Sequence, residues 1–232
     1  MYLITAGEIA LTLAGKAVDT IKTGEILGEM AVICESPAGS TRSATATAKT
    51  ECTVLSLDAE QLHGALKRTP EFALMLMSVM FDRLRFVTAR LAMRKVTPVR
   101  DDARAAAVFD GAALASLEQK LERATTLRYQ AGKTIMNQGD IGTNMYIVLD
   151  GSVGIYVNGK AVESVGAGGA FGEMALVDQS TRSATAVAES ESALLAINRA
   201  ALISLVKSDP AVGLTMLRSV ATRLRNMTAS LT

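Results

Sequence analysis

The chain carries one module twice, and this internal repeat restricts the possible folds more than any other feature. The stretch MYLITAGEIALTLAGKAVDTIKTGEILGEMA, beginning at Met1, aligns without a gap with MYIVLDGSVGIYVNGKAVESVGAGGAFGEMA, beginning at Met145. A second shared stretch, TRSATA, begins at Thr41 in the first copy and at Thr181 in the second copy. The intervening segment is ICESPAGS in the first copy and only VDQS in the second copy. Such a repeat predicts two similar folded modules instead of one large fold.

The two copies begin differently. Residues 102–144 precede the second copy and have no counterpart before Met1. Within them, the apolar spacing of residues 113–124 predicts a helix, and residues 127–135 predict strand structure with a turn at an Ala-Gly pair. The first copy is therefore expected to lack its N-terminal helix and about two strands. Because an uncovered sheet edge pairs readily with another chain, two alternatives stay open: the sequence is part of a longer protein, or another chain covers these edges.

The second copy shows the predicted order of elements in each module. Residues 145–157 predict two strands with a break at an Asp-Gly pair. Asn158 and Gly159 predict a hairpin turn, because both central residues must tolerate positive φ. Further strands at 160–165 and within 183–197, then a short helix at 198–206, complete the predicted elements of the second copy.

Each module ends in a long amphipathic helix. Apolar residues recur every three or four positions in both helices, as expected for one buried face. They are Phe72, Leu76, Met80, Leu84, Val87 and Leu91 in the first copy, and Val212, Met216, Val220, Leu224, Met227 and Leu231 in the second. The helix methionines, Met75 and Met93 included, are expected in the core or at a helix interface. The predicted domains are residues 1–97 and 98–232, with a linker in residues 96–104.

Composition excludes several classes of function. The net charge of +1 gives no indication that the chain binds nucleic acid or a membrane surface. Two isolated cysteines and one histidine predict neither a disulfide framework nor a metal site. No run of about 18 apolar residues predicts a membrane span, and the N-terminus does not resemble a signal peptide. With no nucleophile–base pair either, we expect a cytoplasmic protein with no catalytic residues and no metal or cofactor.

The segment FGEMALVDQSTRSATA combines residues suited to one anionic ligand. Gly172 permits a close backbone approach, and the turn beginning at Glu173 is expected to present free N–H groups. Arg182 supplies a planar donor fork that matches a phosphate, and Ser183 adds a hydroxyl. The Glu173 carboxylate is able to accept from a sugar hydroxyl. These residues predict a site for a ligand with one anionic group beside a hydroxyl.

FGEMAL followed by RSATA resembles the phosphate-binding cassette of cyclic nucleotide-binding domains, which occur in bacterial catabolite activators, cyclic-nucleotide-dependent kinases and gated channels. The resemblance extends over AGKTIMNQGDIGTNMYIVLDGSV and the final helix, and so over nearly all of residues 105–232 and the whole first copy. It implies a mainly β fold with flanking α-helices: two antiparallel β jelly rolls (double-stranded β-helices), each ending in a long helix. The implied ligand is cAMP or cGMP.

The resemblance also implies residue roles. Glu173 would hold the ribose 2′-hydroxyl, and Arg182 with Ser183 the cyclic phosphate. Other implied ligand contacts in the second copy are Phe171, Gly172, Met174, Ala175 and Ala184. The first copy offers Gly28, Glu29, Met30, Ala31, Arg42, Ser43 and Ala44. Its Leu27 replaces the usual aromatic residue, and its longer loop before Arg42 is able to move that arginine. Arg83, Arg85, Arg223 and Arg225 are candidates for a lid near the base; otherwise the final-helix arginines are expected on a solvated face.

The leading hypothesis is a regulatory sensor that binds a cyclic mononucleotide and passes the signal through its final helix to an effector protein or an attached domain. A dimerisation or structural module with degenerate pockets is the alternative. The long helices or the incomplete first module would form the interface of such a homodimer. The chain contains no helix-turn-helix after its final helix, so no nucleic-acid contact is predicted within it.

Overall fold

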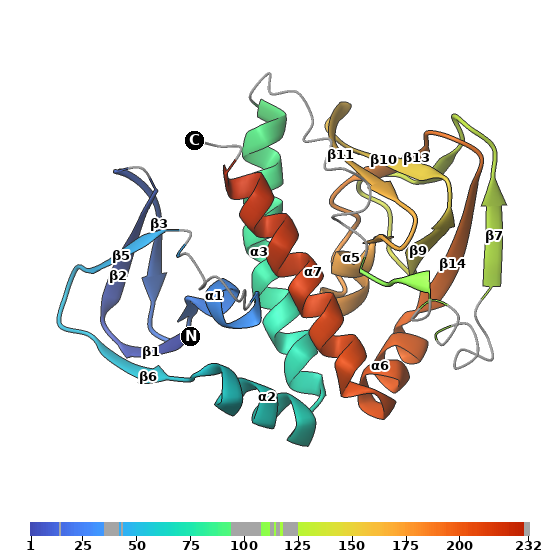
Figure 1. The fold of residues 1–232 in the computed structure, drawn as a ribbon. Coiled ribbons are helices and arrows are strands. Elements are labelled where there is room, and N and C mark those ends of the chain that lie inside the picture. Colours follow the sequence, from blue (N-terminus) through green and yellow to red (C-terminus); the bar gives the residue numbers. More distant parts are fainter. Residues whose placement is uncertain are drawn as a thin grey trace. The chain divides into compact units, whose positions relative to one another are not determined.

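The computed structural model describes residues 1–13, 15–34, 42, 44–93, 108–111, 114, 117 and 125–229 (Figure 1). The chain divides into two compact units, Met1–Thr69 and Pro70–Leu231. The long helix at the end of the first repeat therefore belongs to the second compact unit. The repeat boundaries at 1–97 and 98–232 describe sequence similarity and stay a prediction.

The first unit consists of two small antiparallel sheets and two helices. Its elements are β1 (Tyr2–Ala6), β2 (Glu8–Leu13), β3 (Lys16–Lys22), β4 (Ile26–Leu27), α1 (Glu29–Ile33), β5 (Thr45–Ala48), β6 (Thr53–Ser56) and α2 (Ala59–Arg68). The sheet orders are β4-β1-β6 and β3-β2-β5. Helix α2 begins with a capping box, in which Asp58 and Gln61 satisfy each other's backbone N–H groups.

The second unit has the same plan with one more strand in each sheet. Its elements are α3 (Glu71–Met93), β7 (Thr125–Tyr129), β8 (Thr134–Met136), β9 (Asn144–Asp150), β10 (Ser152–Val157), β11 (Lys160–Gly166), β12 (Ala170–Phe171), α5 (Glu173–Asp178), β13 (Thr185–Ala188), β14 (Ser192–Asn198), α6 (Arg199–Ser208) and α7 (Pro210–Ala229). The sheet orders are β11-β10-β13-β8 and β12-β9-β14-β7. All pairings are antiparallel, as predicted for a β-roll with flanking helices.

Local sequence signals account for most of these elements. Asn158 and Gly159 have φ values of 50° and 75°, which confirms the predicted hairpin turn between β10 and β11. The 127–135 prediction divides into β7 and β8 around the expected Ala-Gly turn. Asn198 caps α6 by accepting from the Ala201 N–H at 2.9 Å. The predicted helix at 113–124 and the linker at 96–104 lie outside the described residues, except that residues 114 and 117 are helical.

The extra strands change the burial of equivalent residues. Leu194 of β14 lies between β9 and β7, is fully buried, and belongs to the core of the second roll. Val54 occupies the matching place in β6, with the same pairing to β1, and is 38% exposed. Leu127 of β7 packs against the core around Leu194, and its counterpart would precede Met1. Among the described residues, β6 therefore has a neighbour on one side only.

Helices α3 and α7 run side by side in the second unit (Figure 1). A Cβ placed on Gly213 would lie 3.1 Å from the Cβ of Ala73, so the helices approach closely near their starts. The apolar stripes predicted for both helices are largely buried, from Leu76 to Leu91 and from Val212 to Met227. The prediction for two methionines was wrong: Met75 is 50% exposed and Met93 is 79% exposed, because both lie off that stripe.

Within the described part of the chain, no single helix has the length and apolar character to cross a membrane. Helices α6 and α7 meet that test only as a pair, and they are bent by 114° relative to each other.

Candidate functional site

The second cassette folds around a glycine. Strand β12 ends at Phe171, and Gly172 then adopts a left-handed conformation (φ 78°, ψ 2°) that starts α5. A Cβ at this position would lie 2.8 Å from Nη1 of Arg182. Glycine is therefore required at position 172 for two reasons: the positive φ, and the space that Arg182 occupies. This local arrangement brings the two ends of the cassette together.

The guanidinium of Arg182 is buried and held by backbone carbonyls. Its side chain donates to the carbonyl oxygen of Gly172 at 2.7 Å and to that of Asn144 at 2.5 Å, and the residue is 5% exposed. No carboxylate of the described residues lies within 4.0 Å of it. Burial lowers the pKa of Arg182 from its ordinary value, while Tyr146, Glu173 and Asp140 oppose that shift. A buried cation without an adjacent counter-ion favours an anionic ligand.

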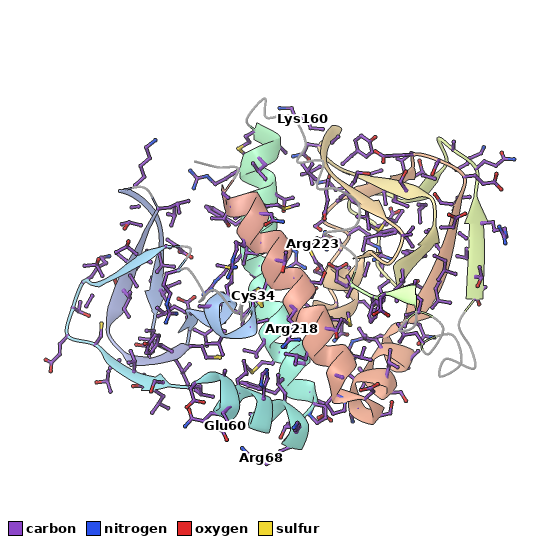
Figure 2. The ribbon with its side chains drawn as sticks, viewed as in Figure 1. Cys34, Glu60, Arg68, Lys160, Arg218 and Arg223 are labelled. Atoms are coloured by element: carbon purple, nitrogen blue, oxygen red, sulfur yellow. The ribbon has the colours of Figure 1, made fainter. Side chains whose placement is uncertain are left out.

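A second cation, Arg223 of α7, lies beside the cassette (Figure 2). It donates to the carboxylates of Glu173 and Glu163, each at 2.6 Å. Burial tends to lower the pKa of Arg223, but the two carboxylates outweigh it, so the pKa is raised and the side chain stays charged. Among the described residues this is the only side-chain hydrogen bond of Glu173. Because a carboxylate has about four acceptor positions, Glu173 keeps capacity for a ligand hydroxyl.

These side chains line one pocket in the second unit. Its polar wall consists of Glu163, Gly172, Glu173, Arg182, Ser183 and Arg223, and its other lining residues are Leu84, Thr88, Met136, Ile155, Val157, Phe171, Met174, Ala175, Ala184 and Met227. The Ser183 hydroxyl donates to the sulfur of Met174 at 3.4 Å. The pocket therefore joins a charged end to an apolar wall, a combination typical of small-molecule sites.

The structure brings together every residue that the sequence assigned to the second site. Of the two candidate lid arginines of the second copy, Arg223 lines the pocket and Arg225 does not. Arg83 and Arg85 were the candidates for the first copy and stay a prediction there. The expectation of a solvated face was wrong for Arg223, because it is enclosed by two carboxylates from other elements.

Sequence reasoning missed four features of this site. Glu163 escaped notice, although Asp19 places an acid at the matching position of the first copy. Two further features have no counterpart in the first copy. One is the backbone carbonyl of Asn144, and the other is Gly142, where a Cβ would lie 2.9 Å from Cζ of Arg182. The contribution of α3 through Leu84 and Thr88 carried no local signal at all.

The described residues of the first cassette begin in the same way as the second cassette. Gly28 is left-handed (φ 72°) and begins α1, in which Glu29 is 1% exposed. A Cβ on Gly28 would lie 3.0 Å from Nη1 of Arg42, much as in the second copy. Arg42, however, is exposed. Of the other residues assigned to this site, Met30 and Ala31 lie in α1, Ala44 is half-buried, and Ser43 lies outside the described residues.

The chain is similar to several known proteins. The model of the cyclic nucleotide-binding domain family matches residues 1–69 and 126–209. The chain is 34% identical over 123 residues to the cyclic AMP receptor protein of Thermus thermophilus, covering 51% of this chain and 57% of that protein. Among solved structures, it is similar to the catabolite activator protein of Thermus thermophilus (33% identity, 53% of this chain and 61% of that one, TM-score 0.47). It is also similar to the regulatory domain of Toxoplasma gondii protein kinase A with cAMP (20% identity, 89% and 74%, TM-score 0.36).

The match spans less than two thirds of each Thermus thermophilus protein. The family model, by contrast, covers most of this chain and includes both copies of the module, with Gly28 and Glu29 in the first match and Gly172, Glu173 and Arg182 in the second. This chain belongs to the cyclic nucleotide-binding domain family.

Proposed function

We propose that the second repeat binds a cyclic mononucleotide, cAMP or cGMP, and that the protein is a regulatory sensor of that ligand. The observation that carries this proposal is the buried guanidinium of Arg182, which lines a pocket and whose hydrogen-bond acceptors in the described part of the chain are backbone carbonyls only. A cyclic phosphate diester carries one negative charge, which is opposite to the charge of Arg182. Glu173 lies on the same polar wall and supplies an acceptor for the ribose 2′-hydroxyl.

The apolar wall is suited to the remaining part of such a ligand. Ile155, Val157 and Met227 offer an uncharged surface for the sugar and the base. This wall contains no side chain that distinguishes adenine from guanine by a full set of hydrogen bonds, so the proposal includes both bases.

The relay of the signal is assigned to α7. Arg223 links this helix to Glu173 in the cassette, so a ligand that contacts Glu173 changes the environment of Arg223. If the ligand binds more tightly to one position of α7 than to another, ligand binding raises the population of the position with the higher affinity. An effector protein or an attached domain would read that shift, and a homodimer through the long helices or the incomplete first unit is a further proposal of the same kind.

Isothermal titration calorimetry with cAMP and cGMP tests the ligand. Arg182→Ala is expected to weaken binding at the second site at least about tenfold, since a charge-assisted hydrogen bond contributes roughly 1.5–3 kcal/mol. Arg42→Ala is the matched variant in the first copy. If both wild-type sites survive the double variant Arg42→Ala plus Arg182→Ala, the assignment is wrong.

Two further ligands sharpen the test. A 5′-mononucleotide, whose phosphate carries close to two charges at pH 7, is expected to bind more weakly than the cyclic diester. A 2′-deoxy cyclic nucleotide lacks the hydroxyl assigned to Glu173 and is expected to lose affinity in the wild type but not in Glu173→Leu, which has no side-chain acceptor.

A structural module is the second candidate, and one observation favours it. Arg223 forms ion pairs with both Glu163 and Glu173 inside the pocket, so the fold has a use for these charges apart from any ligand. No thermal shift with any cyclic nucleotide, together with a stable dimer in light scattering, would support this candidate.

A further inference from the structure

One face of helix α3 is built into the second roll. Leu84 and Thr88 line the pocket, and Ala92, one turn further along, packs in the hydrophobic core of the second roll. By sequence this helix belongs to the first repeat, and it follows α2 of the first unit after a break at Thr69 and Pro70. A helix with the sequence of one repeat therefore forms part of the binding pocket of the other.

Arg85 lies next to Leu84 and holds the loop that follows α5. Its guanidinium donates to the carboxylate of Asp178 and, at 2.8 Å, to the hydroxyl of Ser180. The second carboxylate oxygen of Asp178 accepts from the Ser180 backbone N–H at 3.0 Å. The side chains of Arg85 and Asp178 are 24% and 14% exposed, so this cluster is largely shielded from water and is stronger than a surface ion pair.

The anchored loop leads directly to Arg182. Gln179 has a positive φ of 59°, so the chain reverses sharply within the loop. On the far side of the loop, the Arg182 N–H donates to the carbonyl oxygen of Asp140 at 2.8 Å, and the Gly139 N–H donates to that of Arg182 at 2.9 Å. The backbone at Arg182 is thus held from two directions, by residues 139–140 and by the loop attached to α3.

We infer that Arg85 is a positioning residue for the phosphate subsite of the second repeat, and that it makes the affinity of this subsite depend on helix α3. This inference rests on the proposed function for the identity of the ligand. Since α3 continues directly from the first unit in the chain, a displacement of α3 that originates there would alter the second site. Such coupling is reciprocal: a ligand bound at Arg182 would stabilise the position of α3 that Arg85 requires.

Calorimetric titration of cAMP into the full chain tests this coupling, with Arg42→Ala as the background so that only the second site is measured. Arg85→Ala is expected to weaken binding about five- to tenfold, the range for residues that act through a contact network. Asp178→Asn is expected to have a similar effect. The double variant should bind no more weakly than the weaker single variant, because both substitutions remove the same cluster. The affinity of Arg85→Lys should lie between those of the background and Arg85→Ala, since lysine keeps the charge but lacks the planar guanidinium, which donates to Asp82, Asp178 and Ser180.

Arg90→Ala is the matched control, because Arg90 stacks on Phe86 of its own helix, 5.5 Å from the ring centroid, and does not line the pocket. The affinity of the Arg90→Ala variant for cAMP should stay within about twofold of that of the Arg42→Ala background. Hydrogen exchange supplies a readout without ligand: amides of residues 178–182 should exchange faster in Arg85→Ala than in Arg90→Ala.

The outcomes separate the two proposals. If Arg182→Ala abolishes binding while Arg85→Ala binds within twofold of the background, the inference about α3 is wrong and the proposed function stands. Additive losses in the double variant also overturn the inference, because they assign Arg85 and Asp178 to separate roles. If the wild-type chain binds neither cAMP nor cGMP, the proposed function is wrong and this inference is wrong with it.

Discussion

Arg223 donates a hydrogen bond of 2.6 Å to Glu173, and so the last described helix of the chain and the first turn of the cassette share one buried ion pair. Glu163 accepts from the same guanidinium. The positive charge of Arg223 therefore lies between two carboxylates and offsets part of the repulsion between them. The pair ties the position of α7 to the site at which a ligand hydroxyl is proposed to bind.

Arg223→Ala is expected to lower the free energy of unfolding by about 3–5 kcal/mol, because it leaves two buried carboxylates without their cation. Urea unfolding at pH 7 measures the change. Arg218→Ala is the control, since Arg218 is exposed on the same helix. A difference between the two variants below about 0.5 kcal/mol, the usual range for surface substitutions, would contradict the ion-pair assignment.

Gly172→Ala is expected to reduce the affinity for cyclic nucleotide, because its Cβ would lie 2.8 Å from Nη1 of Arg182 and displace the guanidinium. Gly159→Ala is a matched variant: Gly159 has a similar φ of 75° but no atom within 4 Å of an added Cβ. Both variants carry the strain of a left-handed residue, about 1–2 kcal/mol. Only Gly172→Ala should weaken binding in calorimetry, and equal affinities would show that Arg182 tolerates displacement.

Leu55→Ala and Leu195→Ala test the difference in burial between the two copies. Leu195 is 2% exposed and Leu55 is 56% exposed, although both occupy the same place in the repeat. Leu195→Ala should therefore lower the free energy of unfolding by about 2–5 kcal/mol, whereas Leu55→Ala should change it by no more than about 0.5 kcal/mol. Urea unfolding of the full chain compares them, and a large loss in Leu55→Ala would indicate that a partner covers β6 in solution.

The pKa of Asp178 predicts a pH dependence of stability. Burial tends to raise this pKa, but hydrogen bonds from Ser180 and Arg85 outweigh burial, so it lies below its ordinary value. A carboxylate with a lowered pKa in the folded state stabilises the fold above its unfolded pKa of about 3.9, and that contribution is lost as the pH falls through the lower folded value. Asp178→Asn should therefore be less stable than the wild type at pH 6, and the difference should shrink below about pH 4. A constant difference across this range would argue against the Asp178–Arg85 pair.

Much of the second site was predictable because it is local in the chain. Gly172, Glu173 and Arg182 meet through a tight turn, a short helix and one loop, and the first copy repeats the same residue types around Gly28 and Arg42. Repetition distinguished this pattern from chance, the alternation of apolar residues predicted strands, and the family resemblance implied the roll. Glu163 and Arg85 were not predictable, since their partners lie far away in the sequence and an isolated charged residue on an amphipathic element does not specify its partner.

The sequence by itself determined the hairpin turn of the second unit and the glycine that begins each cassette, since these depend on φ preferences and on residues close in the chain, while the family resemblance implied the β-rolls. Only the tertiary structure decided the surroundings of each cassette. An amphipathic helix specifies that one face is buried but not the surface against which it packs. The tertiary structure shows that α3 packs on the second cassette. Long-range packing also encloses Arg182, whereas Arg42, with the same local sequence, is exposed to solvent.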